Sequence, residues 1–151
     1  MCRNEWNPQL CGKPKQKCGE CGNRQFLPLT YEDVYRHLEG KKEDGSDVIG
    51  LYVLNGDNTC HLLCADFDDK SCEHGYQDDV LAFVGVCKSW GVPCSIERSR
   101  SGKGAHVWIF FGMPVLAVKA RRLGNAILTE AMNRDRRISF KSNDRFFPNQ
   151  D

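Results

Sequence analysis

The chain has 151 residues, enough for one domain with a sizeable hydrophobic core. Its apolar fraction of 40% is ordinary, and the sequence has neither a run of about eighteen apolar residues nor a hydrophobic signal core near Met1, so we expect a cytosolic protein without a membrane partner. The net charge of +1 argues against a protein that coats nucleic acid, but it is unevenly placed: residues 1–97 carry 10 basic and 16 acidic side chains, and residues 98–151 carry 11 basic and 4 acidic ones. The second part should attract a triphosphate or a nucleic acid.

The first 24 residues are rich in cysteine. Nine cysteines in the whole chain are many for a compartment in which disulfides are disfavoured, which favours metal binding. Four lie in residues 1–24, among turn-forming Pro and Gly: Cys2, Cys11, Cys18 and Cys21. The two-residue spacer in the last pair lets both thiolates face one tetrahedral ion, so we expect a zinc knuckle that holds this segment together. Redox use of that pair is the alternative, but no strand precedes it and no helix follows directly.

A short helix is predicted over residues 31–39. Thr30 is a good N-cap with Asp33 three positions later, and Gly40 is a suitable stop. After a polar link, residues 48–54 are predicted to form a strand, residues 55–58 a hairpin turn and residues 59–68 the returning strand. The period of two places four residues of the second strand on one face: Cys60, Leu62, Cys64 and Asp66.

Asp66 and Asp68 lie two residues apart at the end of this strand, so both carboxylates should point to the same side and share divalent cations. Metal sites for phosphoryl and nucleotidyl transfer are built in this way. An Asp-x-Asp pair at a strand end is also common as a turn or a cap, and that alternative stays open.

The next part of the sequence predicts a helix over residues 76–90 and a hairpin of strands 94–100 and 105–111. The turn at residues 101–104 contains two glycines, and His106 opens the second strand. Exposed N–H groups of such a turn could hold a triphosphate beside the metal ions. An ordinary hairpin turn and a packed histidine are the alternatives.

A long helix is predicted from Pro114 to about Asn133. Five apolar residues should face inward: Val115, Val118, Leu123, Ile127 and Met132. Three basic residues should face outward: Lys119, Arg121 and Arg122. From residue 48 the order is β-β-α-β-β-α, which predicts an α+β fold with a mostly antiparallel sheet and helices on one face.

Three stretches resemble the three motifs of archaeo-eukaryotic primases: residues 65–70 (ADFDDK), 96–111 (IERSRSGKGAHVWIFF) and 143–151 (NDRFFPNQD). The sequence is most similar to the primase domain of TOTE conflict systems, from Cys2 to Asp151. This resemblance implies an RRM-like catalytic core over residues 25–151, following the zinc knuckle of residues 1–24. Domains of this family continue past the third motif, so the core is expected to be incomplete at its C-terminal end.

The resemblance also implies a function, a template-directed nucleotidyltransferase of the DNA primase and polymerase type. Its partners would be a DNA or RNA template, nucleoside triphosphates, and helicase or nuclease domains of a longer protein. Asp66, Asp68 and Asp144 would hold two Mg²⁺ or Mn²⁺ ions, with Asp151 as the competing choice for the third ligand. Five residues would bind the phosphates of the incoming nucleotide: Arg98, Arg100, Ser101, Lys103 and His106. Arg145 is a weaker candidate.

Two other functions use the same residues. A metal-dependent nuclease or phosphoesterase could use the carboxylates and His106, and a zinc-bearing fragment could bind nucleic acid without catalysis. The sequence has no Walker phosphate loop, which argues against ATP hydrolysis.

Overall fold

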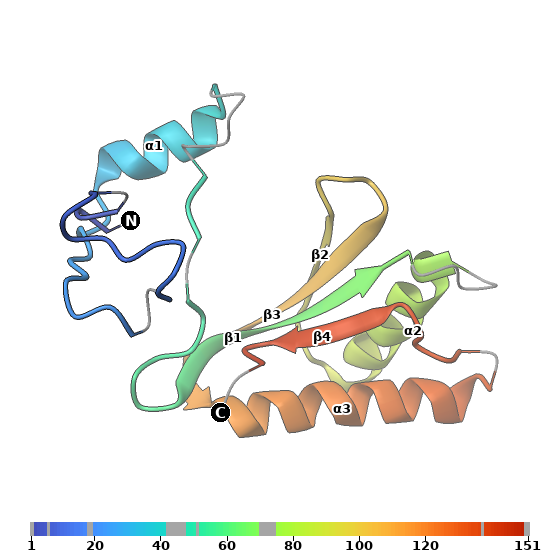
Figure 1. Cartoon of the computed structure of the whole chain (residues 1–151). Coiled ribbons are helices and arrows are strands. Elements are labelled where there is room, and N and C mark those ends of the chain that lie inside the picture. Colours follow the sequence, from blue (N-terminus) through green and yellow to red (C-terminus); the bar gives the residue numbers. More distant parts are fainter. Residues whose placement is uncertain are drawn as a thin grey trace. The chain divides into compact units, whose positions relative to one another are not determined.

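The computed structural model divides the chain into two units, Met1–Leu51 and Tyr52–Asp151 (Figure 1). The residues that it describes are 2–5, 7–17, 20–41, 48–50, 52–69, 75–136 and 138–149. Within these ranges no helix combines the length and the apolar character needed to cross a membrane.

The first unit contains helix α1 (Tyr31–Glu39), as predicted. The Thr30 side chain accepts a hydrogen bond from the Asp33 N–H, and the Asp33 carboxylate accepts one from the Thr30 N–H, which completes a capping box. Gly40 ends the helix in the left-handed conformation, with φ of 58°. None of the residues of α1 is buried.

The second unit is built on a four-stranded antiparallel sheet with the order β2-β3-β1-β4. The strands are β1 (Thr59–Asp68), β2 (Ser95–Arg98), β3 (Gly104–Leu116) and β4 (Asn143–Phe147). Helices α2 (Gly75–Trp90) and α3 (Ala117–Arg134) connect β1 to β2 and β3 to β4. The α+β class and the antiparallel sheet are confirmed.

The hydrophobic core lies between the helices and one face of this sheet. Alternate residues of β1, Leu63, Ala65 and Phe67, are fully buried there. The Phe67 ring meets Phe83 of α2 edge-on, with a centroid distance of 5.8 Å. The opposite face of the sheet therefore carries the intervening residues of β1, including Asp66.

The predicted strand over residues 48–54 is wrong for residues 48–50 and 52–54, and Leu51 lies outside the described residues. β3 and β4 pair with the two sides of β1, so no edge of β1 is left for a preceding hairpin strand. Val48 and Tyr52 are accordingly 58% and 91% exposed. The predicted turn does form, because the Asn55 N–H donates to the Thr59 carbonyl over 2.8 Å.

The face predicted for Cys60 is also wrong. The pairing of β1 with β3 shifts between Cys60 and Leu62, as a β-bulge does, and Cys60 packs in the core cluster with Leu63. Residues beyond the bulge alternate as expected.

The predicted start of the last helix at Pro114 is wrong as well, because β3 continues to Leu116 and α3 begins at Ala117. β2 pairs with β3 no further than Trp108, so Pro114 lies where its missing N–H costs no hydrogen bond with β2. Of the residues predicted to face inward, Ile127 is fully buried, whereas Val118 and Met132 are exposed.

Candidate metal and nucleotide site

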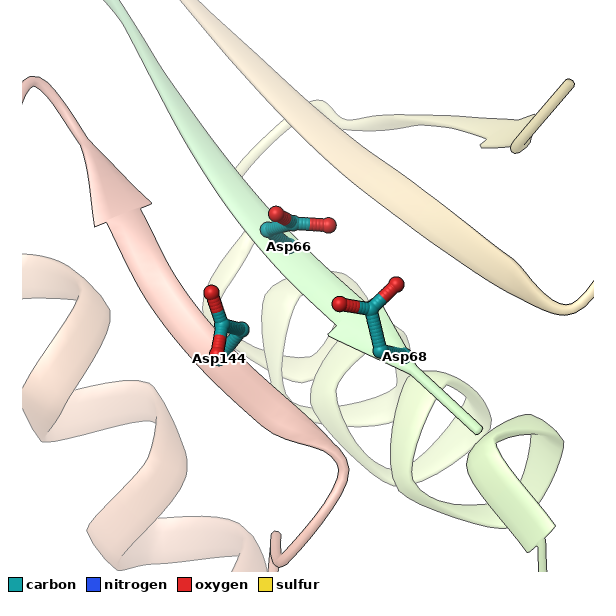
Figure 2. Close-up of side chains that lie close together, drawn as sticks. All are labelled: Asp66, Asp68 and Asp144. Atoms are coloured by element: carbon teal, nitrogen blue, oxygen red, sulfur yellow. The ribbon is translucent and has the colours of Figure 1, made fainter. Parts of the chain in front are cut away.

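Three carboxylates meet on the open face of the sheet (Figure 2). Asp66 and Asp68 come from β1 and Asp144 from β4, and a carboxylate oxygen of each lies within 4.8 Å of the others. Among the described residues this is the only group of three or more potential metal ligands that meets this distance. We call it the acidic triad.

Asp144 joins the triad because of an irregularity in the sheet. Asp66 pairs with Arg145 and Phe67 pairs with Asn143, so Asp144 is an extra residue between the two pairs. Regular alternation would send Asp144 and Arg145 to opposite faces. In Figure 2 the Asp144 carboxylate lies on the same side as those of Asp66 and Asp68.

The surroundings of Asp66 disfavour its charged form. Burial raises the pKa of Asp66, the Asp68 and Asp144 carboxylates raise it further, and His106 and Arg145 oppose the shift. Carboxylate oxygens are the donors that Mg²⁺ and Mn²⁺ prefer, so this donor set fits a divalent cation.

His106 lies next to the triad on β3, paired with Asp66. Its Nε2 is 3.4 Å from Asp66 Oδ1, and its Nδ1 is 3.2 Å from Glu97 Oε2. The same Glu97 oxygen accepts a hydrogen bond of 2.8 Å from Trp108 Nε1. The carboxylate of Glu97 therefore orients the imidazole, and sequence reasoning missed this residue. Counting outward from the predicted turn at residues 101–104 pairs Glu97 with Trp108, whereas the observed register pairs it with His106, so the predicted turn alone could not have found this contact.

The loop between β2 and β3 ends close to Asp68, where β3 begins. The Asp69 N–H donates to the Lys103 carbonyl over 2.8 Å, and a Cβ on Gly104 would come within 2.5 Å of the Phe67 carbonyl oxygen and 3.0 Å of Asp68 Oδ1. Only glycine allows this close approach of the loop to the end of β1.

The other predicted phosphate ligands lie in or beside this loop. The Ser101 hydroxyl accepts from the Lys103 N–H over 3.2 Å, and the Arg98 guanidinium donates to the Gly102 carbonyl over 3.4 Å. Arg100 and Lys103 are exposed. Arg145 forms a 2.5 Å ion pair with Asp144, so one cation is already beside the triad.

A buried hydrogen bond ties the segment before β4 to helix α2. The hydroxyl of Ser142, which is fully buried, donates to Asp79 Oδ2 over 2.5 Å, and the Ser142 carbonyl accepts from the Asp68 N–H over 2.8 Å. This contact fixes the chain two residues before Asp144.

The predicted zinc ligands lie in the first unit. Cys2, Cys11 and Cys21 line a cavity of about 20 Å³, but their sulfur atoms do not all lie within 4.8 Å of one another. The Gln25 N–H donates to Cys2 Sγ over 3.2 Å. Cys18 lies outside the described residues, as does Asp151, the competing choice for the third carboxylate. The zinc site stays a prediction.

The family described as the TOTE conflict system archaeo-eukaryotic primase domain matches the chain over residues 1–151. The chain belongs to this family. A comparison of this primase domain with curated proteins gave no match. Membership indicates a nucleotidyltransferase-like function with nucleic acid and nucleotides as substrates, and the acidic triad of this primase domain fits the use of divalent metal ions.

Proposed function

We propose that this primase domain is a template-directed nucleotidyltransferase of the DNA primase and polymerase type. The observation that carries the proposal is the acidic triad, in which Asp144 of the third sequence motif meets Asp66 and Asp68 of the first beside His106 of the second. Membership in a primase domain family supports it independently.

The roles of the residues follow from their positions. Asp66, Asp68 and Asp144 would hold two Mg²⁺ or Mn²⁺ ions, which lower the pKa of an attacking 3′-hydroxyl and neutralise charge on the triphosphate. His106, held by Glu97 at Nδ1, would donate a hydrogen bond from Nε2 to a phosphate oxygen of the incoming nucleotide when both ring nitrogens are protonated.

The loop after β2 would hold the rest of the triphosphate. Lys103 and Arg100 are exposed and can turn their positive charges toward it, and Ser101 offers a hydroxyl. Arg98 already contacts the Gly102 carbonyl and would keep the loop in shape while contributing charge.

We also propose that residues 1–24 form a structural zinc knuckle. The cavity shared by Cys2, Cys11 and Cys21, and the Gln25 N–H that donates to Cys2 Sγ, support thiolate ligands there, with Cys18 as the fourth. Purified protein should carry one zinc ion per chain by elemental analysis, and Cys21→Ser should lose it. Zinc retained at full occupancy in that variant would contradict the site.

The test of the main proposal is incorporation of labelled deoxynucleotides and ribonucleotides on a primed and an unprimed template with Mn²⁺ or Mg²⁺. Incorporation is expected for the unchanged chain and should be lost in Asp66→Ala/Asp68→Ala. Asp69→Ala is the matched control, because Asp69 follows the triad residues directly but does not belong to the triad. Its activity should stay close to that of the unchanged chain.

Two outcomes would overturn the proposal. Metal-dependent cleavage of the template without nucleotide incorporation would make the triad the site of a nuclease or phosphoesterase. Template binding without incorporation or cleavage would make the chain a zinc-bearing nucleic-acid-binding module.

A further inference from the structure

Three aromatic side chains lie next to the acidic triad: Trp108 and Phe110 of β3 and Phe147 of β4. Trp108 and Phe147 both pair with Cys64 of β1, one from each side. Paired residues of antiparallel strands point to the same face, so both rings stand on the face that carries Asp66. We call these three residues the aromatic platform.

The platform continues the row of residues that makes the metal site. Asp66, two residues after Cys64, pairs with His106 on one side and Arg145 on the other. Two residues along a strand correspond to about 7 Å, so the platform begins roughly one nucleotide's length from the triad. It lies on the side away from the loop at residues 101–104, because β3 runs from Gly104 past His106 to Trp108.

The rings of β3 are ordered and accessible. The Trp108 and Phe110 rings are stacked, with planes 10° apart and centroids 6.3 Å apart, and the His106 ring meets Trp108 edge-on at 5.9 Å. The hydrogen bond from Trp108 Nε1 to Glu97 fixes the indole. The Phe110 side chain is nevertheless 66% exposed, so packing in the hydrophobic core does not explain an aromatic residue at this position. Fixed aromatic rings on an open sheet face are suited to stack with nucleobases.

The charge beside the platform points to a nucleic acid rather than an apolar protein segment. The Arg145 guanidinium lies 6.0 Å from the centre of the Phe147 ring, where it can contact a backbone phosphate while a base contacts the rings. Residues 98–151, which include β3 and β4, carry 11 basic and 4 acidic side chains.

We propose that the aromatic platform stacks with the bases of single-stranded nucleic acid and so holds a strand at the metal site. The proposal rests on the proposed function and deepens it, because it names the surface that receives the strand. Stacking is tolerant of sequence, since every base has a π face.

The test uses Trp108 as its own reporter. The chain has three tryptophans, so Trp6→Phe/Trp90→Phe leaves Trp108 as the only one. Oligothymidylate should quench the Trp108 fluorescence. An abasic oligonucleotide of the same length and charge should quench it far less and bind about 5- to 100-fold more weakly. Equal quenching and equal affinity would show binding through phosphates alone and would overturn the proposal.

Variants that remove one aromatic ring but keep an apolar side chain show whether weaker binding comes from lost stacking or from an unfolded protein. Phe110→Leu and Phe147→Leu keep an apolar side chain but remove the ring, and each should weaken oligothymidylate binding by about 5-fold or more without changing binding of the abasic strand. Tyr52→Leu is the control, because Tyr52 is 91% exposed and lies outside the platform. A circular dichroism melt checks each fold, and oligothymidylate affinity unchanged in both folded platform variants would overturn the proposal.

The result of this binding test is distinguishable from the result of the nucleotide-incorporation test of the proposed function. Base-dependent quenching in a chain that incorporates no nucleotide would refute the nucleotidyltransferase and leave the platform standing. Incorporation together with equal quenching by both oligonucleotides would refute the platform alone.

Discussion

Glu97 and His106 face each other across β2 and β3, with Glu97 Oε2 3.2 Å from His106 Nδ1. Since the Nδ1 side of the imidazole contacts Glu97, the Nε2 side points toward Asp66 Oδ1, 3.4 Å away. A carboxylate behind a functional histidine fixes the position and orientation of its ring.

Replacement of Glu97 should therefore impair nucleotide incorporation. Glu97→Ala is expected to lower kcat/KM by about 10- to 100-fold, the usual cost of losing a residue that orients a functional group. Glu97→Gln keeps an oxygen acceptor for His106 and should lose less. In a His106→Ala background, Glu97→Ala should cost little more, because its effect passes through the imidazole. An unchanged kcat/KM for Glu97→Ala would contradict this role.

The raised pKa of Asp66 predicts that the folding stability of the metal-free protein depends on pH. The folded state raises this pKa above its ordinary value of 3.8, so the metal-free protein loses stability as pH rises from below 3.8 through the raised pKa. Asp66→Asn should then raise the thermal midpoint in EDTA at pH 7, by about 2 °C given solvent screening, and the difference should vanish at low pH.

Divalent metal should reverse this order at pH 7. Mn²⁺ stabilises the form that binds it, so the midpoint of the unchanged chain should rise with Mn²⁺ concentration and that of Asp66→Asn should not. Differential scanning calorimetry measures both. An Asp66→Asn chain that melts below the unchanged chain in EDTA at pH 7 would show that folding does not raise the pKa of Asp66.

The glycine that opens β3 should be essential for activity. A Cβ on Gly104 would come within 2.5 Å of the Phe67 carbonyl oxygen, so Gly104→Ala must push the loop away from Asp68. We expect incorporation to fall by about 10-fold or more with loss of triphosphate affinity. Gly112→Ala in the same strand is the matched control, since nothing lies within 4 Å of its Cβ. Equal activity of both variants would contradict the close approach.

The hydrogen bond between Ser142 and Asp79 should contribute to stability. Both residues are buried and the bond is charge-assisted, so Ser142→Ala should lower the free energy of unfolding by about 2 kcal/mol. A double-mutant cycle with Asp79→Asn in urea isolates the pairwise energy. A coupling near zero would mean that the contact does not hold the segment before β4.

Local sequence patterns predicted the elements whose signals are local. The Thr30 and Asp33 capping box fixed the start of α1, and the spacing of Asp66 and Asp68 on β1 placed their carboxylates on one side. The predictions failed where strand pairing decides the structure. Residues 48–54 have strand-like composition, but both sides of β1 are taken by strands that come later in the sequence.

The candidate site was predictable only in part for the same reason. Asp144 reaches Asp66 through an irregular pairing of β4 with β1, which no local pattern encodes, and its place was expected only from the resemblance to primase motifs. Glu97 was missed because its partners, His106 and Trp108, lie across a hairpin rather than nearby in sequence.

The most direct test of the account is a count of Mn²⁺ bound to the chain by electron paramagnetic resonance, with a non-hydrolysable nucleoside triphosphate present. If the triad holds the two ions of a nucleotidyl transfer site, the unchanged chain should bind about two Mn²⁺. Asp66→Asn, Asp68→Asn and Asp144→Asn should each lose at least one, and Asp69→Asn should lose none. No binding by the unchanged chain, or full binding by the Asp144→Asn chain, would contradict a metal site built from all three carboxylates.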